Sequence, residues 1–344
     1  MQMRTEERIP QRRNENIRKA VREVYIYVFL LIIVLVFSLI GAAKGVPWFG
    51  KGHFLGKNSI ISMARQAVPI ITLACGFTFV MVAGYMDLSV GSAMGLTQVI
   101  YAIVVRAGYP FVIGLLAAVC VGVLCGLVNG TIVARFRITP VIATLVTMTV
   151  FKGIAILLVP TGVSGIKSTD TMKMPEWISY YGRSKSLFGL PPAFYAALLI
   201  VLVIVIIQHR TLIGKYSQAI GGNAMSAALA GINTVKYIMI IYMITGILSA
   251  FAGVAQASYN SLGNPLGGTG YETDCIIAVL LGGTAFEGGE GSAFKSVIGA
   301  IIIICITVGM LTVVEAYYQG FIKGAVLVLA VTLNKLLNKE ESLV

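Results

Sequence analysis

Few polar side chains interrupt the long apolar runs of this 344-residue sequence, so those that do are the candidates for chemistry. The most prominent is Asp87, in the Gly-rich break 84–92 between two apolar runs. On insertion scales a carboxylate at bilayer depth costs about 2.5–3.5 kcal/mol, so such a group is expected to face a cavity or a partner. Serine and glycine follow Asp87, a pattern that also predicts a helix cap. We prefer capping over direct contact with a substrate, and the two roles are compatible.

Other polar residues also interrupt the apolar runs. Glu272 and Asp274 open a short apolar segment, where the positive N-terminal end of a helix favours carboxylates, and capping is again the preferred role. Asn129 lies in a Gly-rich run and is expected to hydrogen-bond to another helix or to line the path. The residues predicted to line a translocation path are therefore Asp87, Ser89, Ser92, Asn129, Glu272 and Asp274.

Three cations also fall within apolar runs: Arg65, Lys152 and Lys323. The two lysines are expected either to snorkel to the membrane surface or to pair with a carboxylate. The sequence does not identify which carboxylate that would be, and it leaves the role of Arg65 open.

Catalytic signatures are missing from the sequence. It contains no G-x-x-x-x-G-K-[ST] phosphate loop, no H-E-x-x-H zinc motif and no G-x-S-x-G nucleophile motif. The five cysteines lie in apolar runs without metal-ligand spacing, and the two histidines fall on opposite sides of the predicted membrane. We therefore expect no catalytic residue, no metal and no cofactor in this chain, and no ATP hydrolysis by it.

The segment 209–234 has the features of a docking element. Basic residues flank it, and the positive-inside tendency places it in the cytoplasm. A Gly-Gly pair interrupts the chain, Asn223 is suited to cap a new helix, and Gly231 is suited to end it. An ordinary connecting loop is the alternative, but the near absence of charge between Lys215 and Lys236 favours docking. The residues predicted to couple this segment to a cytoplasmic motor are Lys215, Gly221, Gly222, Asn223, Ala227, Ala228 and Gly231.

The composition places these residues in an all-α integral membrane protein. Charged residues make up 12% of the chain, whereas soluble proteins carry about 25%. We predict a basic cytoplasmic tail, 1–22, followed by one transmembrane domain, 23–340, with about ten helices and an external loop at 160–192. An even number of crossings puts both termini in the cytoplasm. The net charge of +12 is explained by this topology and by contact with anionic lipid, without a nucleic-acid-binding face.

The expected helices follow the apolar runs. They are 24–43, 59–83, a third ending near 105, 111–134, 139–159, 193–208, 237–257, the short segment 271–283, 296–313 and 320–337, with an external loop at 258–270. Small residues recur every three or four positions in the fourth and seventh helices, which predicts close static packing, with sliding during transport as the alternative. The breaks 87–92 and 287–292 resemble each other, and paired interruptions are typical of a transport pathway. We thus predict a weak internal two-fold repeat.

These motifs resemble the membrane permeases of bacterial ATP-binding-cassette (ABC) sugar importers, the ribose/galactoside/xylose permease family. The matching stretches run in order over nearly the whole chain: 87–92, Asn129-Gly130, Thr139-Pro140, 214–215, 219–223, 231–232, Tyr271-Glu272 with Asp274, 281–284, 288–289, 291–292, and Gln319 with 323–325. Two positions depart from the family pattern. Thr273 replaces an apolar residue, and Asn334 replaces a common aspartate, which weakens any role for a charge there.

The resemblance implies a multi-pass protein of the bacterial cytoplasmic (inner) membrane that conducts a monosaccharide. It implies a second permease copy, as a homodimer or a heterodimer with a paralogue. It also implies a separate ATPase subunit that binds ATP and Mg²⁺, and an extracytoplasmic sugar-binding protein. ATP binding would close the ATPases and move the docking helices with them.

Other functions compete with this one. The closer rival is an ABC permease for a nucleoside, a branched-chain amino acid or a quorum signal. An ion-coupled secondary transporter is a more distant rival, since it would need acidic residues within the membrane in both halves of the chain. A membrane enzyme is the weakest alternative, because no nucleophile–base pair or metal cluster is visible.

Overall fold

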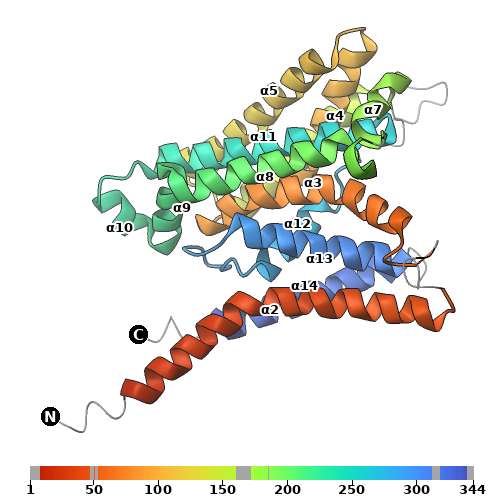
Figure 1. Cartoon of the computed structure of the whole chain (residues 1–344). Helices are drawn as coiled ribbons and strands as arrows, with labels where there is room; N and C mark the ends of the chain where they lie inside the picture. The colour runs from red at the N-terminus through yellow and green to blue at the C-terminus, as the bar shows by residue number, and fades with distance from the viewer. Residues whose placement is uncertain are drawn as a thin grey trace.

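The protein is a bundle of helices that run roughly along one direction (Figure 1). The structure is a computed structural model that describes residues 8–46, 50, 53–159, 172–184, 186–311 and 318–338. The long helices are α2 (Arg8–Ala43), α3 (Lys57–Val82), α4 (Val90–Arg106), α5 (Phe111–Gly130), α6 (Pro140–Leu158), α8 (Pro192–Arg210), α11 (Thr234–Asn260), α13 (Ala293–Leu311) and α14 (Tyr318–Asn338). The shorter elements are the π-turn η1 (Thr131–Arg135), η3 (Glu176–Ile178), α7 (Ser179–Arg183), η4 (Leu187–Gly189), α9 (Leu212–Gly222), α10 (Ala224–Leu229), α12 (Tyr271–Leu281) and the strands β1 (Met172–Lys173) and β2 (Leu262–Gly263).

A helix occupies each of the ten places expected from the apolar pattern, within the part of the chain that is described. Seven of these helices are long and apolar enough to cross a membrane. Two others, α4 and α14, are apolar but shorter over their described residues. The tenth, α12, has 11 residues, and at 1.5 Å per residue it reaches about 16 Å, roughly half of the hydrocarbon core. The structure therefore supports a multi-pass membrane protein, whereas ten complete crossings stay a prediction.

Burial divides the helices into an inner and an outer group. Most of α3, α11 and α13 is buried, whereas α2, α5, α6 and α8 expose long rows of Leu, Ile and Val side chains. A soluble protein would bury such rows, so their outward orientation fits contact with lipid.

The two predicted small-residue stripes pack against each other. Glycines of α5 contact the backbone of α11: a Cβ added to Gly122 would collide with the carbonyl of Gly246, and one on Gly126 with that of Tyr242. Close backbone approach of this kind holds helices together in lipid, where little hydrophobic force is available. The predicted close packing is confirmed, and sliding of the two helices stays untested.

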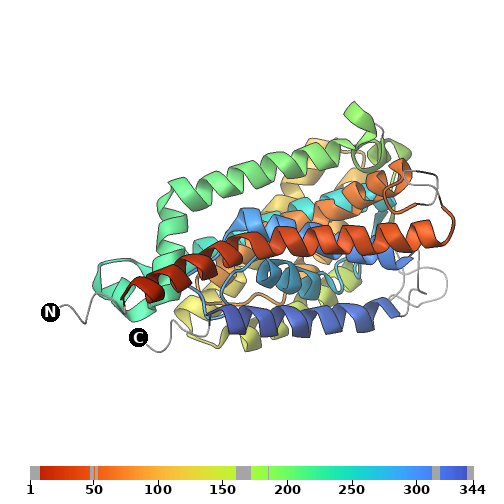
Figure 2. The same cartoon turned by 60° about the horizontal axis from the view of Figure 1, so that its bottom comes forward.

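The two ends of the bundle differ. Figures 1 and 2 show α9 and α10 at one end, together with the first turns of α2 and the last turns of α14, and α7 at the opposite end. Both ends of the described chain thus lie at the same end of the bundle as the predicted docking segment. The structure does not itself assign a side of the membrane, so the cytoplasmic location of the termini stays a prediction.

The segment 258–270 is not a simple external loop as expected. It begins as the last turn of α11, pairs through β2 with β1, and then returns into the bundle along α4. A Cβ on Gly95 would collide with the Pro265 carbonyl, and one on Gly91 with the Gly268 carbonyl, so the returning chain follows α4 towards its first turn. Non-helical backbone is tolerated at this depth because protein surrounds it. The half-length helix α12 therefore starts inside the bundle.

Candidate functional site

The predicted docking segment forms two short helices. α8 ends at Arg210, and α9 and α10 follow. The side chain of Asn223 caps α10, because its Oδ1 accepts the backbone N–H of Ser226 at 2.9 Å. Gly231, with φ +84°, lies just beyond the end of α10. These cap and stop assignments are confirmed, whereas α9 was not expected from the sequence.

The surface of α10 differs from the expectation of an almost smooth helix. Ala227 packs against the rest of the chain and is 5% exposed, so it is not available to a partner, whereas Ala228 is exposed. Met225 and Leu229 are 73% and 84% exposed. Exposed large apolar side chains on a helix that stands away from the bundle are typical of an interaction surface. These two residues, overlooked in the sequence, are the best candidates for the docking contact.

The C-terminal end of α9 packs directly against two polar breaks, the first break (83–89) and the second break (282–292). A Cβ on Gly221 would collide with the carbonyl oxygen of Val82 and would lie 2.5 Å from the nitrogen of Gly289. The Gly289 N–H donates to the same Val82 oxygen at 2.8 Å. We call this contact of backbones the glycine junction, and its members are Val82, Gly84, Gly221, Gly288 and Gly289.

The glycine junction joins the two breaks to each other as well as to α9. A Cβ on Gly288 would lie 2.7 Å from the Cα of Gly84 and 3.1 Å from that of Gly221. No side chains separate the three segments at this point. A displacement of α9 must therefore also displace both breaks, because close-packed atoms leave no free volume between these segments.

Gln208, near the end of α8, strengthens this connection. Its side chain is buried and accepts the N–H of Ala293 at 2.8 Å, at the start of α13, while it donates to the Gly291 carbonyl at 3.1 Å. Gln208 of α8 thus caps the first turn of α13 and holds the second break in place through its bond to Gly291. The sequence offered no reason to single out Gln208, since its partners lie more than 80 positions away.

Three of the predicted path residues form one buried polar cluster beside the first break. Asp87 Oδ1 accepts the backbone N–H of Ser89 at 2.9 Å and its hydroxyl at 2.7 Å. Asn129, at the end of α5, donates to Ser89 Oγ at 2.7 Å and to Asp87 Oδ1 at 3.3 Å. Each of the three is at most 3% exposed. Asp87 therefore stabilises the turn that leads into α4, and a role in solute passage stays a prediction.

The remaining predicted residues lie elsewhere. Ser92 donates to the Ser89 carbonyl at 2.8 Å within the first turn of α4. The carboxylate of Glu272 accepts the N–H of Gly270 at 3.1 Å and so caps the chain entering α12. Asp274 pairs with Lys323 of α14 at 2.8 Å. Lys323 therefore has the acidic partner that the sequence could not identify.

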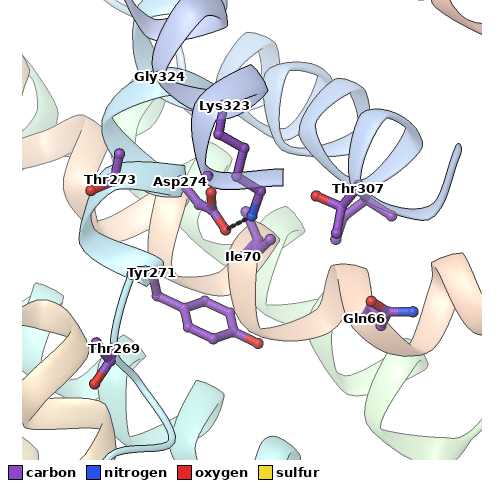
Figure 3. A pocket seen from close by; sticks show the side chains of 12 residues that line it. Gln66, Ile70, Thr269, Tyr271, Thr273, Asp274, Thr307, Lys323 and Gly324 are labelled. Atoms are coloured by element: carbon purple, nitrogen blue, oxygen red, sulfur yellow. Dashed lines mark hydrogen bonds and ion pairs between the residues drawn. The ribbon is translucent and has the colours of Figure 1, made fainter. Parts of the chain in front are cut away.

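The Asp274–Lys323 pair borders a cavity of about 440 Å³ between α3, α12, α13 and α14. Figure 3 shows the pair at the wall of this cavity with the ring of Tyr271 below it and Gln66 of α3 across from it. Most of the polar residues that line the cavity were not among the predicted path residues: Gln66, Thr269, Tyr271, Thr273 and Thr307.

Two cations are explained differently from Lys323. Arg65 donates to the Arg183 carbonyl at 2.8 Å and thereby ties α3 to α7. Lys152 of α6 is exposed, and its side chain forms no hydrogen bond or ion pair with the described residues. Among the described residues, no group of three or more His, Cys, Asp or Glu side chains is arranged to hold a metal ion.

Comparisons with known proteins fit a pore-forming subunit. A family model described as the permease component of branched-chain amino acid transport systems matches residues 59–331. The chain belongs to this permease family. Relatives of the permease include the ribose import permease RbsC of Escherichia coli (strain K12), which is 34% identical over 81% of this chain and 86% of the relative. No solved structure matches the chain.

Further relatives carry other sugar names. The galactofuranose transporter permease YtfT of Escherichia coli (strain K12) is 33% identical over 83% of this permease and 81% of the relative. The D-allose permease AlsC from the same organism is 30% identical over 83% and 86%. The permease is therefore a transport component and not an enzyme, as the missing catalytic motifs predicted.

Proposed function

We propose that this permease forms the translocation path of an ATP-driven ABC importer for a monosaccharide resembling ribose, galactose or xylose. The observation that carries the proposal is the glycine junction: α9 packs, backbone to backbone, against both breaks of the bundle, and the capped helix α10, with its exposed apolar residues Met225 and Leu229, follows α9 directly. Such a connection allows another protein that moves α9 and α10 to move the interior of the bundle as well. The chain contains no phosphate-binding loop of its own, so in an ATP-driven importer a partner subunit hydrolyses the ATP.

The partners follow from this function. An ATPase subunit with ATP and Mg²⁺ docks on α10, and the coupling residues Lys215, Gly221, Gly222, Asn223, Ala228 and Gly231 transmit its motion. A second permease copy completes the path, and an extracytoplasmic binding protein delivers the sugar. α10, the chain termini and the ATPases then lie on the cytoplasmic side of a bacterial inner membrane. Asp87, Ser89, Ser92, Asn129, Glu272 and Asp274 belong to the path or hold its walls.

The sugar is supported by the names of the relatives, whereas the description of the family supports a branched-chain amino acid. We favour the sugar because several relatives, each aligned over at least four-fifths of this chain, are sugar permeases.

The test is uptake by the complex reconstituted in liposomes with its ATPase and its binding protein. Labelled D-ribose should accumulate only when ATP and the binding protein are present, and an ionophore that collapses ion gradients should leave uptake unchanged. Uptake without the ATPase, or loss of uptake on collapsing the gradient with ATP held constant, would overturn the proposal in favour of secondary transport. Accumulation of L-leucine and of no sugar would assign the amino acid.

A further inference from the structure

The geometry points to the cavity beside the Asp274–Lys323 pair as a transient binding site for the transported sugar, one that reads its hydroxyl groups. This inference rests on the proposed function and adds the place where the solute pauses and the groups that hold it. Four helices and the returning chain before α12 form the cavity.

The cavity lies inside the bundle, in the half away from the glycine junction: Thr307 is in the last two turns of α13 and Gly320 in the first turn of α14. Gln66 and Ile70 line it from α3, whose last residue, Val82, belongs to the glycine junction. At 1.5 Å per residue they lie about 18–24 Å from that junction. Gln66 is also nine residues after Lys57, the start of α3, which corresponds to about 14 Å. A solute held here would lie within the span of the helices and well separated from the glycine junction, inside a hydrocarbon core about 30 Å thick.

Groups in the cavity have hydrogen-bonding capacity that the protein does not use. Asp274 Oδ2 accepts from Lys323 at 2.8 Å, which leaves Oδ1 and two ammonium hydrogens for a ligand. The hydroxyl of Tyr271 forms no hydrogen bond with the described residues. In Figure 3 the Tyr271 ring lies below the ion pair and is directed towards Gln66.

The charges that border the cavity favour a ligand without charged groups. The two charges bordering it are 2.8 Å apart and compensate each other, and the other polar lining groups are hydroxyls and amides. An amino acid zwitterion would have to compete with the pair for both partners, whereas a polyhydroxylated ligand can bond to both without separating them. The volume of about 440 Å³ suits a small molecule with some bridging water.

The buried cluster of Asp87, Ser89 and Asn129 is a weaker candidate for such a site. Those side chains are at most 3% exposed and bond mainly to one another. A sugar would have to disrupt that cluster to reach them, whereas the cavity at α12 is already open.

The test combines direct binding with transport. Saturation-transfer NMR is recorded on the permease–ATPase complex in nanodiscs, without binding protein, with D-ribose as the probe and L-leucine as the competitor. We expect transfer to D-ribose that L-leucine does not displace. Tyr271→Phe removes one free hydroxyl and leaves the ion pair in place, and we expect it to weaken the D-ribose signal about threefold to tenfold. The matched control is Tyr109→Phe, at an exposed tyrosine in the turn between α4 and α5, which should leave the signal unchanged.

Transport provides the second measurement. In the full complex, Tyr271→Phe should lower the amount of sugar moved per ATP hydrolysed, while ATPase stimulation by the loaded binding protein persists. Lys323→Met should abolish the binding signal, whereas Lys152→Met, at an exposed intramembrane lysine, should not. If Lys323→Met fails to assemble, Thr307→Val tests the opposite wall with the pair intact and should also weaken binding.

The outcomes separate this inference from the proposed function. If wild-type complex shows no ATP-driven sugar uptake, the proposed function fails. If the wild type transports sugar but Tyr271→Phe and Thr307→Val match the control in both measurements, the cavity is not the site and the function stands. Displacement of D-ribose by L-leucine would overturn the assignment to a neutral polyol.

Discussion

Replacing Gly221 by alanine tests whether backbone contact at the glycine junction connects α9 to the breaks. The added Cβ would lie 2.5 Å from the nitrogen of Gly289, whereas ordinary contacts begin at 3.4 Å, and it would collide with the Val82 carbonyl. α9 and the second break must therefore separate by about 1 Å. Overpacking of this kind costs about 1–3 kcal/mol in the free energy of unfolding.

The neighbouring Gly222 provides a matched control. A Cβ there meets no atom within 4 Å, and neither glycine has a positive φ. Both substitutions reduce backbone freedom in the unfolded chain at the same end of α9. Each should therefore stabilise α9 by up to about 1 kcal/mol through this effect. The difference between Gly221→Ala and Gly222→Ala thus isolates the contact at the junction.

The assays are thermal unfolding of the purified complex and sugar transported per ATP hydrolysed in liposomes. Gly221→Ala should lower the unfolding midpoint by a few degrees relative to Gly222→Ala. It should also lower the amount of sugar transported per ATP hydrolysed, because α9 is no longer in direct contact with the second break and moves it less. Equal midpoints and equal coupling for the two variants would refute the argument that the junction transmits the motion.

Three further substitutions test the polar contacts around the breaks. Asn129→Leu should lower the free energy of unfolding of the permease by about 1–3 kcal/mol, because it removes the amide that donates to Asp87 and Ser89. Equal unfolding midpoints for variant and wild type would contradict this. Gln208→Leu should lower both uptake and the unfolding midpoint, because it leaves the start of α13 uncapped. The control is His209→Gln, at the exposed neighbouring residue, which should change neither. Similar effects of the two substitutions would exclude the capping role. Asn223→Ala should weaken ATPase binding through a helix-cap loss of about 1 kcal/mol, and Asn223→Ser should restore it; loss of binding in both variants would show that the cap is not what matters.

The helices could be predicted because lipid exposure imposes a simple rule on sequence. A run of apolar residues long enough to cross the membrane identifies α5, α6 and α8 with errors of a few residues. The cap at Asn223 was predictable for a similar reason, since capping depends on residues within one turn.

Contacts between distant segments were not predictable in the same way. Lys323 and Asp274 are 49 residues apart, and nothing near either one identifies its partner. α9 was missed because three of its 11 residues are glycines, which oppose helix formation locally; packing of Gly221 against the breaks favours the helix in the folded protein.

The returning chain before α12 misled the prediction through its composition. Gly, Asn and Pro at 258–270 are typical of a surface turn, and the sequence does not reveal that α4 provides a glycine-lined surface to receive it. Similarly, the alanines of α10 look equivalent in the sequence, although Ala227 is buried and Ala228 is exposed.

The glycine junction also has a thermodynamic consequence. Side chains that pack at a moving seam must exchange rotamers, and immobilising them again costs conformational entropy in every cycle. Glycines have no side-chain rotamers to order, so α9 and the breaks can shift while they stay in contact, with little entropic penalty. A seam of this kind suits a movement that must be reversed each time a solute molecule passes.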